Sequence, residues 1–233
     1  MALRKDVIVS LITLLYSYAL PLVKSANILN RVHSVEFFRR RGFFCRPDFL
    51  DEATRADLLE RLRRASPTRA KVFDGAPDAV VNLTARNAWQ LSLDDGPIDL
   101  AARLGALRAD LSAHFHIPLQ EHEGPTLLMY KAGGFYEPHV DRAGEDEPAI
   151  APSRRRVSVV TFLNAMSPEP GPGDYAGGTL TFYGLIDDPA WQSIGFALDP
   201  MPGLLVAFPS HLLHEVTPVT AGDRYTIVDW FTI

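Results

Sequence analysis

The stretch LLVAFPSHLLHEVTPVTAGDRYTIVDWFTI, residues 204–233, indicates the fold class of this chain. Two apolar runs within it, residues 204–208 and 225–232, are separated by proline, glycine and polar residues. Short apolar runs bounded by turn residues are typical of strands in a β-sandwich or barrel. The same pattern appears earlier, at residues 126–130, 157–163 and 178–183. The sequence therefore predicts a β-rich half from residue 126 onward.

Upstream of residue 126 the apolar residues follow a helical period instead. Residues 48–64 are expected to form a helix, with Asp48 or Asp51 as its N-cap. Residues 97–115 are expected to form a second helix, with Pro97 near its start. The predicted fold class is α+β, mainly β: a double-stranded β-helix (jelly roll) core with supporting N-terminal helices.

The length and composition suit a globular chain with its own core. At 233 residues and 47% hydrophobic residues, the chain can bury such a core without disulfides. We expect three parts: an apolar N-terminal helical segment (1–30), a helix-rich support region (31–125) and a jelly-roll catalytic core (126–233). The net charge of −5 argues against a nucleic-acid partner. Cys45 is the single cysteine, which excludes an intramolecular disulfide.

The N-terminal segment admits three interpretations. Residues 7–23 are uncharged and follow Arg4-Lys5, which resembles a secretory signal or a short membrane anchor. We favour an amphipathic helix, packed on the domain or lying on a membrane surface, because polar residues recur at helical spacing. These residues are Asp6, Ser10, Thr13, Ser17 and Lys24. The expectation is a cytoplasmic protein with peripheral membrane contact through residues 6–24, and the other two interpretations stay open.

Three residues suggest a metal site. In His139-Val140-Asp141, alternation along a strand would point the imidazole and the carboxylate to one face. A third ligand, His214, follows the apolar run at residues 204–208, and a turn near residues 219–223 would fold Arg224 back beside the His214 strand. Two histidines and one carboxylate leave three positions open on iron. The guanidinium of Arg224 suits a substrate carboxylate.

Three other histidines also lie at spacings that could suit a metal ligand. His211 lies three residues before His214 and is the alternative third ligand; it is thirteen residues from Arg224, whereas His214 is ten. His114 and His116 have metal-like spacing but no accompanying carboxylate, so a helix end with a surface histidine is the simpler interpretation.

These residues together resemble the prolyl 4-hydroxylase-like branch of the Fe(II)/2-oxoglutarate-dependent dioxygenase superfamily. The resemblance rests on the order His139-x-Asp141, Gly177-Gly178-Thr179, then His214 with Arg224 ten residues later, and it covers residues 126–233. It implies iron ligands at His139, Asp141 and His214, and Arg224 on the distal carboxylate of 2-oxoglutarate.

The resemblance also suggests roles for residues around the metal. Tyr130 matches the family tyrosine that hydrogen-bonds the co-substrate, and Trp230 matches an aromatic residue of the same pocket. Tyr136 is the candidate substrate-binding residue. Where some relatives place a second hydroxyl donor this chain has Phe162, and we expect Thr226 to supply the hydroxyl from the Arg224 strand.

The implied activity is hydroxylation of an unactivated carbon with O2, releasing succinate and CO2. The resemblance implies Fe(II), 2-oxoglutarate and ascorbate (vitamin C) as cofactors. A prolyl residue in a peptide is the favoured substrate, ahead of a free amino acid or other small molecule. Polar residues 142–156 and the Pro/Gly-rich insert 167–175 are candidate walls of the site. The alternatives outside this family are a non-catalytic cupin-like metal-binding protein and a non-oxidative cupin-type enzyme.

Overall fold

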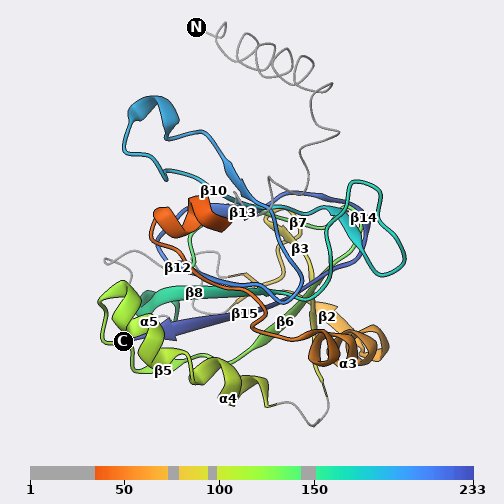
Figure 1. Cartoon of the computed structure of the whole chain (residues 1–233). Coiled ribbons are helices and arrows are strands. Elements are labelled where there is room, and N and C mark those ends of the chain that lie inside the picture. Colours follow the sequence, from red (N-terminus) through yellow and green to blue (C-terminus); the bar gives the residue numbers. More distant parts are fainter. Residues whose placement is uncertain (1–34, 73–78, 94–98, 143–150) are drawn as a thin grey trace, which may run out of the picture.

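The computed structural model describes residues 35–72, 79–93, 99–142 and 151–233. The predicted helical segment 1–30, with its polar stripe, lies outside these residues. In the described part, antiparallel sheets dominate, and the helices between residues 52 and 115 lie on one side of them (Figure 1). This arrangement confirms the predicted mainly β class with supporting helices. Among the described residues, no helix has both the length and the apolar character needed to span a membrane.

The larger sheet has eight strands. Their order is β1 (Phe44–Arg46), β12 (Leu205–Pro209), β8 (Arg155–Phe162), β15 (Arg224–Thr232), β6 (Thr126–Tyr130), β4 (Trp89–Leu91) and β2 (Pro67–Arg69), with β5 (Glu121–His122) also pairing with β15. The long β15 lies between β8 and β6. The predicted apolar runs at residues 126–130, 157–163, 204–208 and 225–232 thus become neighbouring strands of this sheet.

A smaller sheet faces the larger one. Its five strands run in the order β11 (Phe196–Leu198), β10 (Leu180–Phe182), β13 (His214–Val216), β7 (Phe135–His139) and β3 (Arg86–Asn87). A separate pair is formed by β14 (Val219–Gly222) and β9 (Tyr175–Gly177). Two short 3-10 helices, Ala151–Arg154 and Pro189–Trp191, lie in the connections.

Alternate residues of the central strands face two different cores. In β6, Leu127 and Met129 pack with the helices, whereas Leu128 and Tyr130 pack between the sheets. In β15, Tyr225 and the other odd-numbered apolar residues share the helix-side core. Because strand side chains alternate, the even-numbered residues of β15, Arg224 among them, face the smaller sheet. Burial on both faces explains why these strands read as nearly continuous apolar runs.

Helix α3 (Glu52–Arg64) corrects the predicted start at residue 48. Asp51 is the N-cap, because its carboxylate accepts a hydrogen bond from the Thr54 amide at 2.8 Å. Asp48 has a φ of 51°, a left-handed conformation that does not belong to a right-handed helix. Leu58 and Leu62 are buried on the face that packs on the larger sheet.

The single helix predicted over residues 97–115 was wrong, because the structure has two. Helix α4 (Leu100–Gly105) is capped by Asp99, and α5 (Arg108–Phe115) follows after a turn. Gly105 ends α4, where glycine is a poor helix former. A Cβ at Gly105 would lie 3.0 Å from His122 Nε2, so glycine also permits a close approach to β5. The predicted apolar face persists across the break, since Leu104 and Leu111 are both fully buried.

The predicted turn over residues 219–223 was also wrong. Residues Val219–Gly222 form β14, which pairs with β9. Gly222 has a φ of 70°, and a Cβ there would lie 2.3 Å from the Asp174 carbonyl oxygen. The chain therefore crosses into the larger sheet, and Arg224 does not lie beside the His214 strand. Its backbone partner is Tyr130 of β6.

The described part of the predicted support region contributes strands as well as helices. Strands β1, β2, β4 and β5 belong to the larger sheet, and β3 is the edge of the smaller one. The division of the chain at residues 31 and 126 stays a prediction.

Candidate metal centre

Two neighbouring strands of the smaller sheet bring the predicted ligands together. His139 is the last residue of β7, His214 is the first residue of β13, and the two are direct partners in the antiparallel pair. The expectation that His139 and Asp141 share one strand was wrong in detail, because β7 ends at His139. Asp141 lies beyond that end, where its amide donates to the Ser210 carbonyl oxygen at 2.9 Å.

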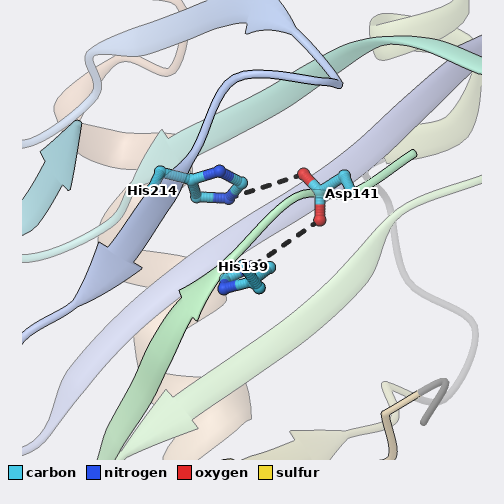
Figure 2. Close-up of side chains that lie close together, drawn as sticks. All are labelled: His139, Asp141 and His214. Carbon is cyan, nitrogen blue, oxygen red and sulfur yellow. Dashed lines mark ion pairs between the residues drawn. The ribbon is translucent and has the colours of Figure 1, made fainter. Parts of the chain in front are cut away.

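The three side chains converge on one point (Figure 2). His139 Nε2 lies 3.7 Å from Asp141 Oδ1, and His214 Nε2 lies 3.6 Å from Asp141 Oδ2. One ligand atom from each residue lies within 4.8 Å of the others. The side chains of His139 and Asp141 are only 16% and 11% exposed. The group can hold one metal ion with three protein ligands.

Backbone carbonyls orient both imidazoles. His139 Nδ1 lies 2.8 Å from the Glu137 carbonyl oxygen, and His214 Nδ1 lies 2.8 Å from that of Leu212. A carbonyl oxygen can only accept a hydrogen bond, so each Nδ1 is the protonated nitrogen. Each Nε2 then keeps its lone pair and points to the shared centre, as a metal ligand requires.

The protonation states also suit a metal. Burial and the neighbouring His214 lower the pKa of His139 to about 3. Burial alone would raise the pKa of Asp141, but the two histidines and hydrogen bonds from Ser158 and Trp230 lower it below its usual value. A neutral imidazole and an ionised carboxylate at neutral pH are the forms that bind a metal.

Trp230 supports Asp141, which is more than the pocket-lining role predicted for it. Its side chain hydrogen-bonds the Asp141 carboxylate. The Arg155 guanidinium lies over the Trp230 ring at 3.8 Å, and Arg155 Nη1 donates to the Asp141 carbonyl oxygen at 3.4 Å. Glu123 holds Arg155 by two hydrogen bonds of 2.6 Å. This chain of contacts orients the carboxylate ligand.

A cavity of about 300 Å³ opens beside the three ligands, between the two sheets. The eight residues singled out in the sequence all line it: Tyr130, Tyr136, His139, Asp141, His214, Arg224, Thr226 and Trp230. The structure therefore brings the predicted site residues into one place, and the role of each stays a prediction.

Arg224 is a buried cation in this cavity. It is 1% exposed, and among the described residues no carboxylate pairs with it. Its Nη1 donates to the Thr226 hydroxyl at 3.4 Å, and its buried Nε has no hydrogen-bond partner. A buried unpaired charge is costly unless a ligand compensates it. The site thus has the chemistry to bind an acid.

Position 162 carries a phenyl ring in place of a hydroxyl donor. Phe162 is the direct strand partner of Thr226, and its ring lies 5.4 Å from the Arg224 guanidinium. Thr226 is 1% exposed and reaches Arg224 with its hydroxyl. The threonine is therefore placed where a missing hydroxyl donor could be replaced.

Sequence reasoning missed Tyr175 of β9. Its side chain is fully buried, and Arg224 is the neighbour that its hydroxyl can hydrogen-bond. Burial raises the pKa of the phenol, and the nearby Arg224 guanidinium opposes that shift. Gly178 explains this close packing, because a Cβ there would meet the Arg224 side chain at 3.0 Å and the Tyr175 ring at 3.6 Å. The position of Tyr175 just before Gly177-Gly178 was the signal available in the sequence.

Arg86 was missed as well. It lies outside the stretch that resembles the family, and nothing in its local sequence marks it. In the structure its guanidinium lies 4.6 Å from the Tyr136 ring, which itself stacks on His139 at 3.5 Å. By contrast, the insert 167–175 does not line the cavity, which removes it as a wall of the site. Residues 143–150 of the other proposed wall lie outside the described residues.

Comparison with known proteins agrees with this geometry. The family model described as the 2OG-Fe(II) oxygenase superfamily matches residues 125–232. A PKHD-type hydroxylase of Shewanella sp. (strain ANA-3) is 31% identical over 180 residues, covering 74% of this chain and 71% of the relative. A PKHD-type hydroxylase of Pseudomonas putida is also 31% identical over 180 residues, covering 75% and 73%.

Solved structures show the same fold. A prolyl-4-hydroxylase of Pseudomonas putida superposes with a TM-score of 0.61 at 24% identity, covering 86% of this chain and 97% of the other. A prolyl hydroxylase from Trichoplax adhaerens, in complex with a hypoxia inducible factor oxygen degradation domain peptide fragment, gives 0.58 at 19% identity, covering 87% and 90%. Identities at this level establish the likeness of fold.

Proposed function

The chain belongs to the 2OG-Fe(II) oxygenase superfamily, and on this basis we propose that His139, Asp141 and His214 hold Fe(II) at its catalytic centre. It is a 2-oxoglutarate/Fe(II)-dependent dioxygenase, a hydroxylase. The observation that carries the assignment of the ligands is their convergence within 4.8 Å beside a buried arginine without a carboxylate partner. A His-Asp-His set with open positions suits non-haem iron(II).

Arg224 binds the distal carboxylate of 2-oxoglutarate in this proposal. Its buried guanidinium, with an unpartnered Nε, supports this role. Thr226 and Tyr130 line the same cavity and offer hydroxyl groups to the co-substrate. Trp230 holds the Asp141 carboxylate in position. Tyr136, stacked on His139, lies where it can contact a substrate.

The protein supplies geometry and a dry cavity, and the bound groups supply the oxidation. When bound, iron(II) and 2-oxoglutarate use O2 to convert a C–H bond to C–OH with release of succinate and CO2. The Nε2 atoms of His139 and His214 and the Asp141 carboxylate would hold the metal. Arg224 fixes the far end of the co-substrate by charge. The apolar neighbours of the cavity, such as Leu128 and Val216, exclude water.

The favoured substrate is a prolyl residue in a peptide. Support comes from the motif spacing of residues 126–233 and from the names of the structural neighbours, one of which holds a peptide. Succinate release from the iron-loaded enzyme, measured against proline-containing peptides and free amino acids, tests this choice. We expect a proline-containing peptide to stimulate release above the uncoupled rate. Stimulation by a small metabolite, with none by any peptide, would leave the dioxygenase assignment and remove the peptide.

Two finer properties belong to the same proposal. Ascorbate is expected to prolong turnover by restoring oxidised iron, and a time course with and without ascorbate tests this. Residues 6–24 are proposed to touch membrane surfaces from the cytoplasm. Sedimentation of the full chain with anionic lipid vesicles, compared with a chain lacking residues 1–26, tests this contact.

A further inference from the structure

Arg86 is a second buried cation in the cavity. It lies on β3, at the edge of the smaller sheet, opposite Tyr136 of β7. Its side chain is nearly enclosed, at 8% exposure, and it lines the same cavity as the three metal ligands. Arg86 stacks on the Tyr136 ring, and Tyr136 stacks on His139. Only the Tyr136 ring therefore separates the guanidinium from the proposed metal ligand His139.

The direct contacts of Arg86 within the protein are with neutral groups, among them the Tyr130 side chain, and the Asp141 carboxylate attracts the guanidinium without forming an ion pair with it. Nη1 donates to the Lys71 carbonyl oxygen at 3.2 Å, and the Tyr136 ring lies under the guanidinium. Its Nε is buried without a hydrogen-bond partner. In the described ranges no carboxylate forms an ion pair with Arg86. A buried guanidinium without a directly paired carboxylate is unfavourable by itself, which points to an anionic ligand.

The other buried charged side chains that line the cavity already have a partner or a proposed ligand. Glu123 is paired with Arg155 through both carboxylate oxygens. Asp141 faces the two histidines, and Arg224 is the proposed partner of the co-substrate. Lys71 lines the cavity too but its residue is exposed. Arg86 is therefore the buried cation left for a group other than 2-oxoglutarate.

We propose that Arg86 is a specificity-determining residue that binds a carboxylate group of the primary substrate. The substrate is then an organic acid: a free amino acid, or a peptide whose carboxylate lies close to the hydroxylated carbon. The planar fork of arginine binds both oxygens of a carboxylate, and the Tyr136 ring holds the fork in place. This inference rests on the proposed function and narrows its substrate class.

Two matched probe pairs test the proposal. The first is L-proline and L-prolinamide; the second is acetyl-Asp-Pro-Asp-amide and acetyl-Asn-Pro-Asn-amide. Binding of each to the enzyme loaded with Fe(II) and 2-oxoglutarate is measured by calorimetry in oxygen-free buffer, so no turnover is required. In at least one pair, the carboxylate member should bind roughly 10- to 100-fold more tightly, as expected for a charge-assisted hydrogen bond. The pair that responds tells an α-carboxylate from a side-chain carboxylate.

Variants assign the preference to one residue. Arg86→Gln should abolish it and leave 2-oxoglutarate binding unchanged, whereas Arg86→Lys, which keeps the charge, should retain part of it. Arg69→Gln is the control: it removes the same charge from β2, where Arg69 stacks on Trp89 outside the cavity. Circular dichroism checks that each variant folds, and Arg86→Lys carries the test if the glutamine variant does not.

Three results would overturn the proposal. In the first, both members of each pair bind with equal affinity, or none of the four probes binds. In the second, the preference for the carboxylate member survives in Arg86→Gln. Arg86→Gln could weaken 2-oxoglutarate binding instead, which would assign the guanidinium to the co-substrate. Failure of the proposed function is seen separately, as a wild-type enzyme that releases no succinate from 2-oxoglutarate in air.

Discussion

At the scale of single residues, the two histidines of the proposed metal centre are oriented by the same kind of hydrogen bond. Each Nδ1 donates to the carbonyl oxygen two residues earlier, so each Nε2 is free to bind. His211, three residues from His214, is exposed and does not belong to the group of converging ligands. The choice between these neighbouring histidines is therefore open to a direct experiment.

His214→Ala should remove Fe(II) binding and turnover, because two ligands rarely retain the ion in water. His211→Ala, a matched loss of an imidazole, should bind iron and turn over as the wild type does. Iron content after gel filtration and succinate release measure both variants. Activity kept by the first and lost by the second would show that the third ligand is His211.

Arg224 can contact a co-substrate in the cavity directly, whereas Tyr175 can act on it only through Arg224. The guanidinium lines the cavity, whereas the tyrosine does not and lies near the arginine from another strand. Tyr175 is therefore a positioning residue for Arg224. Arg224 is the cationic neighbour of its buried hydroxyl, so the phenol oxygen can help to hold the guanidinium.

Arg224→Ala should raise the concentration of 2-oxoglutarate needed for half-maximal rate roughly 10- to 100-fold, since a charge-assisted hydrogen bond contributes about 1.5–3 kcal/mol. Tyr175→Phe, which removes one oxygen, should raise the same requirement by a smaller factor with kcat little changed. Steady-state kinetics over a range of 2-oxoglutarate concentrations separates the two effects. An unaltered requirement in Arg224→Ala would place the carboxylate clamp elsewhere.

At the scale of elements, the turn between β9 and β10 controls how Arg224 packs. Gly177 and Gly178 have φ values of 70° and 61°, in the left-handed region that favours glycine. A Cβ on Gly178 would lie 2.7 Å from a Val219 methyl group and 3.0 Å from the Arg224 side chain. The turn thus carries two constraints, one from the backbone and one from the neighbouring strands.

Gly178→Ala should lower the melting temperature and also raise the 2-oxoglutarate requirement, because the new methyl group displaces Arg224. Gly133→Ala is the matched control: its φ is 79°, but nothing lies within 4 Å of its would-be Cβ. The control should show only the backbone penalty of roughly 1–2 kcal/mol for a left-handed residue. Equal kinetics in the two variants would mean that the turn does not position Arg224.

At the scale of the whole molecule, the site bridges the two sheets. His139 and His214 come from β7 and β13 of the smaller sheet. Arg224, Thr226 and Trp230 come from β15 of the larger one, on the face toward the smaller sheet. A metal and co-substrate bound between them would contact both layers, so their binding should stabilise the fold as a unit.

Adding Fe(II) and 2-oxoglutarate without oxygen should raise the melting temperature of the whole chain. A ligand at a hundred times its Kd adds about 2.7 kcal/mol. For a chain of this size that corresponds to a rise of roughly 5–11 °C. Removal of the metal with a chelator should reverse the rise, and His139→Ala should show none. A rise of the same size in that variant would argue that the metal binds outside the predicted site.

The metal-free fold should lose stability as the pH falls below about 6.5, the ordinary pKa of histidine. In the unfolded chain His139 binds a proton there, whereas the folded state resists protonation until a pH of about 3. Protons therefore favour unfolding across that window. Melting temperatures between about pH 6.5 and 5, where most carboxylates stay ionised, should fall less steeply in His139→Asn. Parallel curves would contradict the assignment.

The sequence by itself determined the features of the fold that depend only on residues close together in the chain. Alternation and turn residues marked the strands of the β-rich half, and a carboxylate near a leucine-rich period marked α3. The spacing of His139, Asp141, His214 and Arg224 was sufficient to predict residues that line one cavity, because chemical type and order along the chain are written in the sequence. These features rest on local geometry and on the chemistry of single side chains.

Only the tertiary structure decided which distant segments meet. It placed Arg224 in the sheet that faces His214, ended β7 before Asp141, and broke the predicted helix at Gly105, where β5 approaches. It also brought Arg86 to the site from a strand that carries no motif, and it packed Tyr175 near Arg224. Strand pairing and close approach between remote segments are set by the burial of both faces of a sheet, a non-local free energy that no short window of sequence contains.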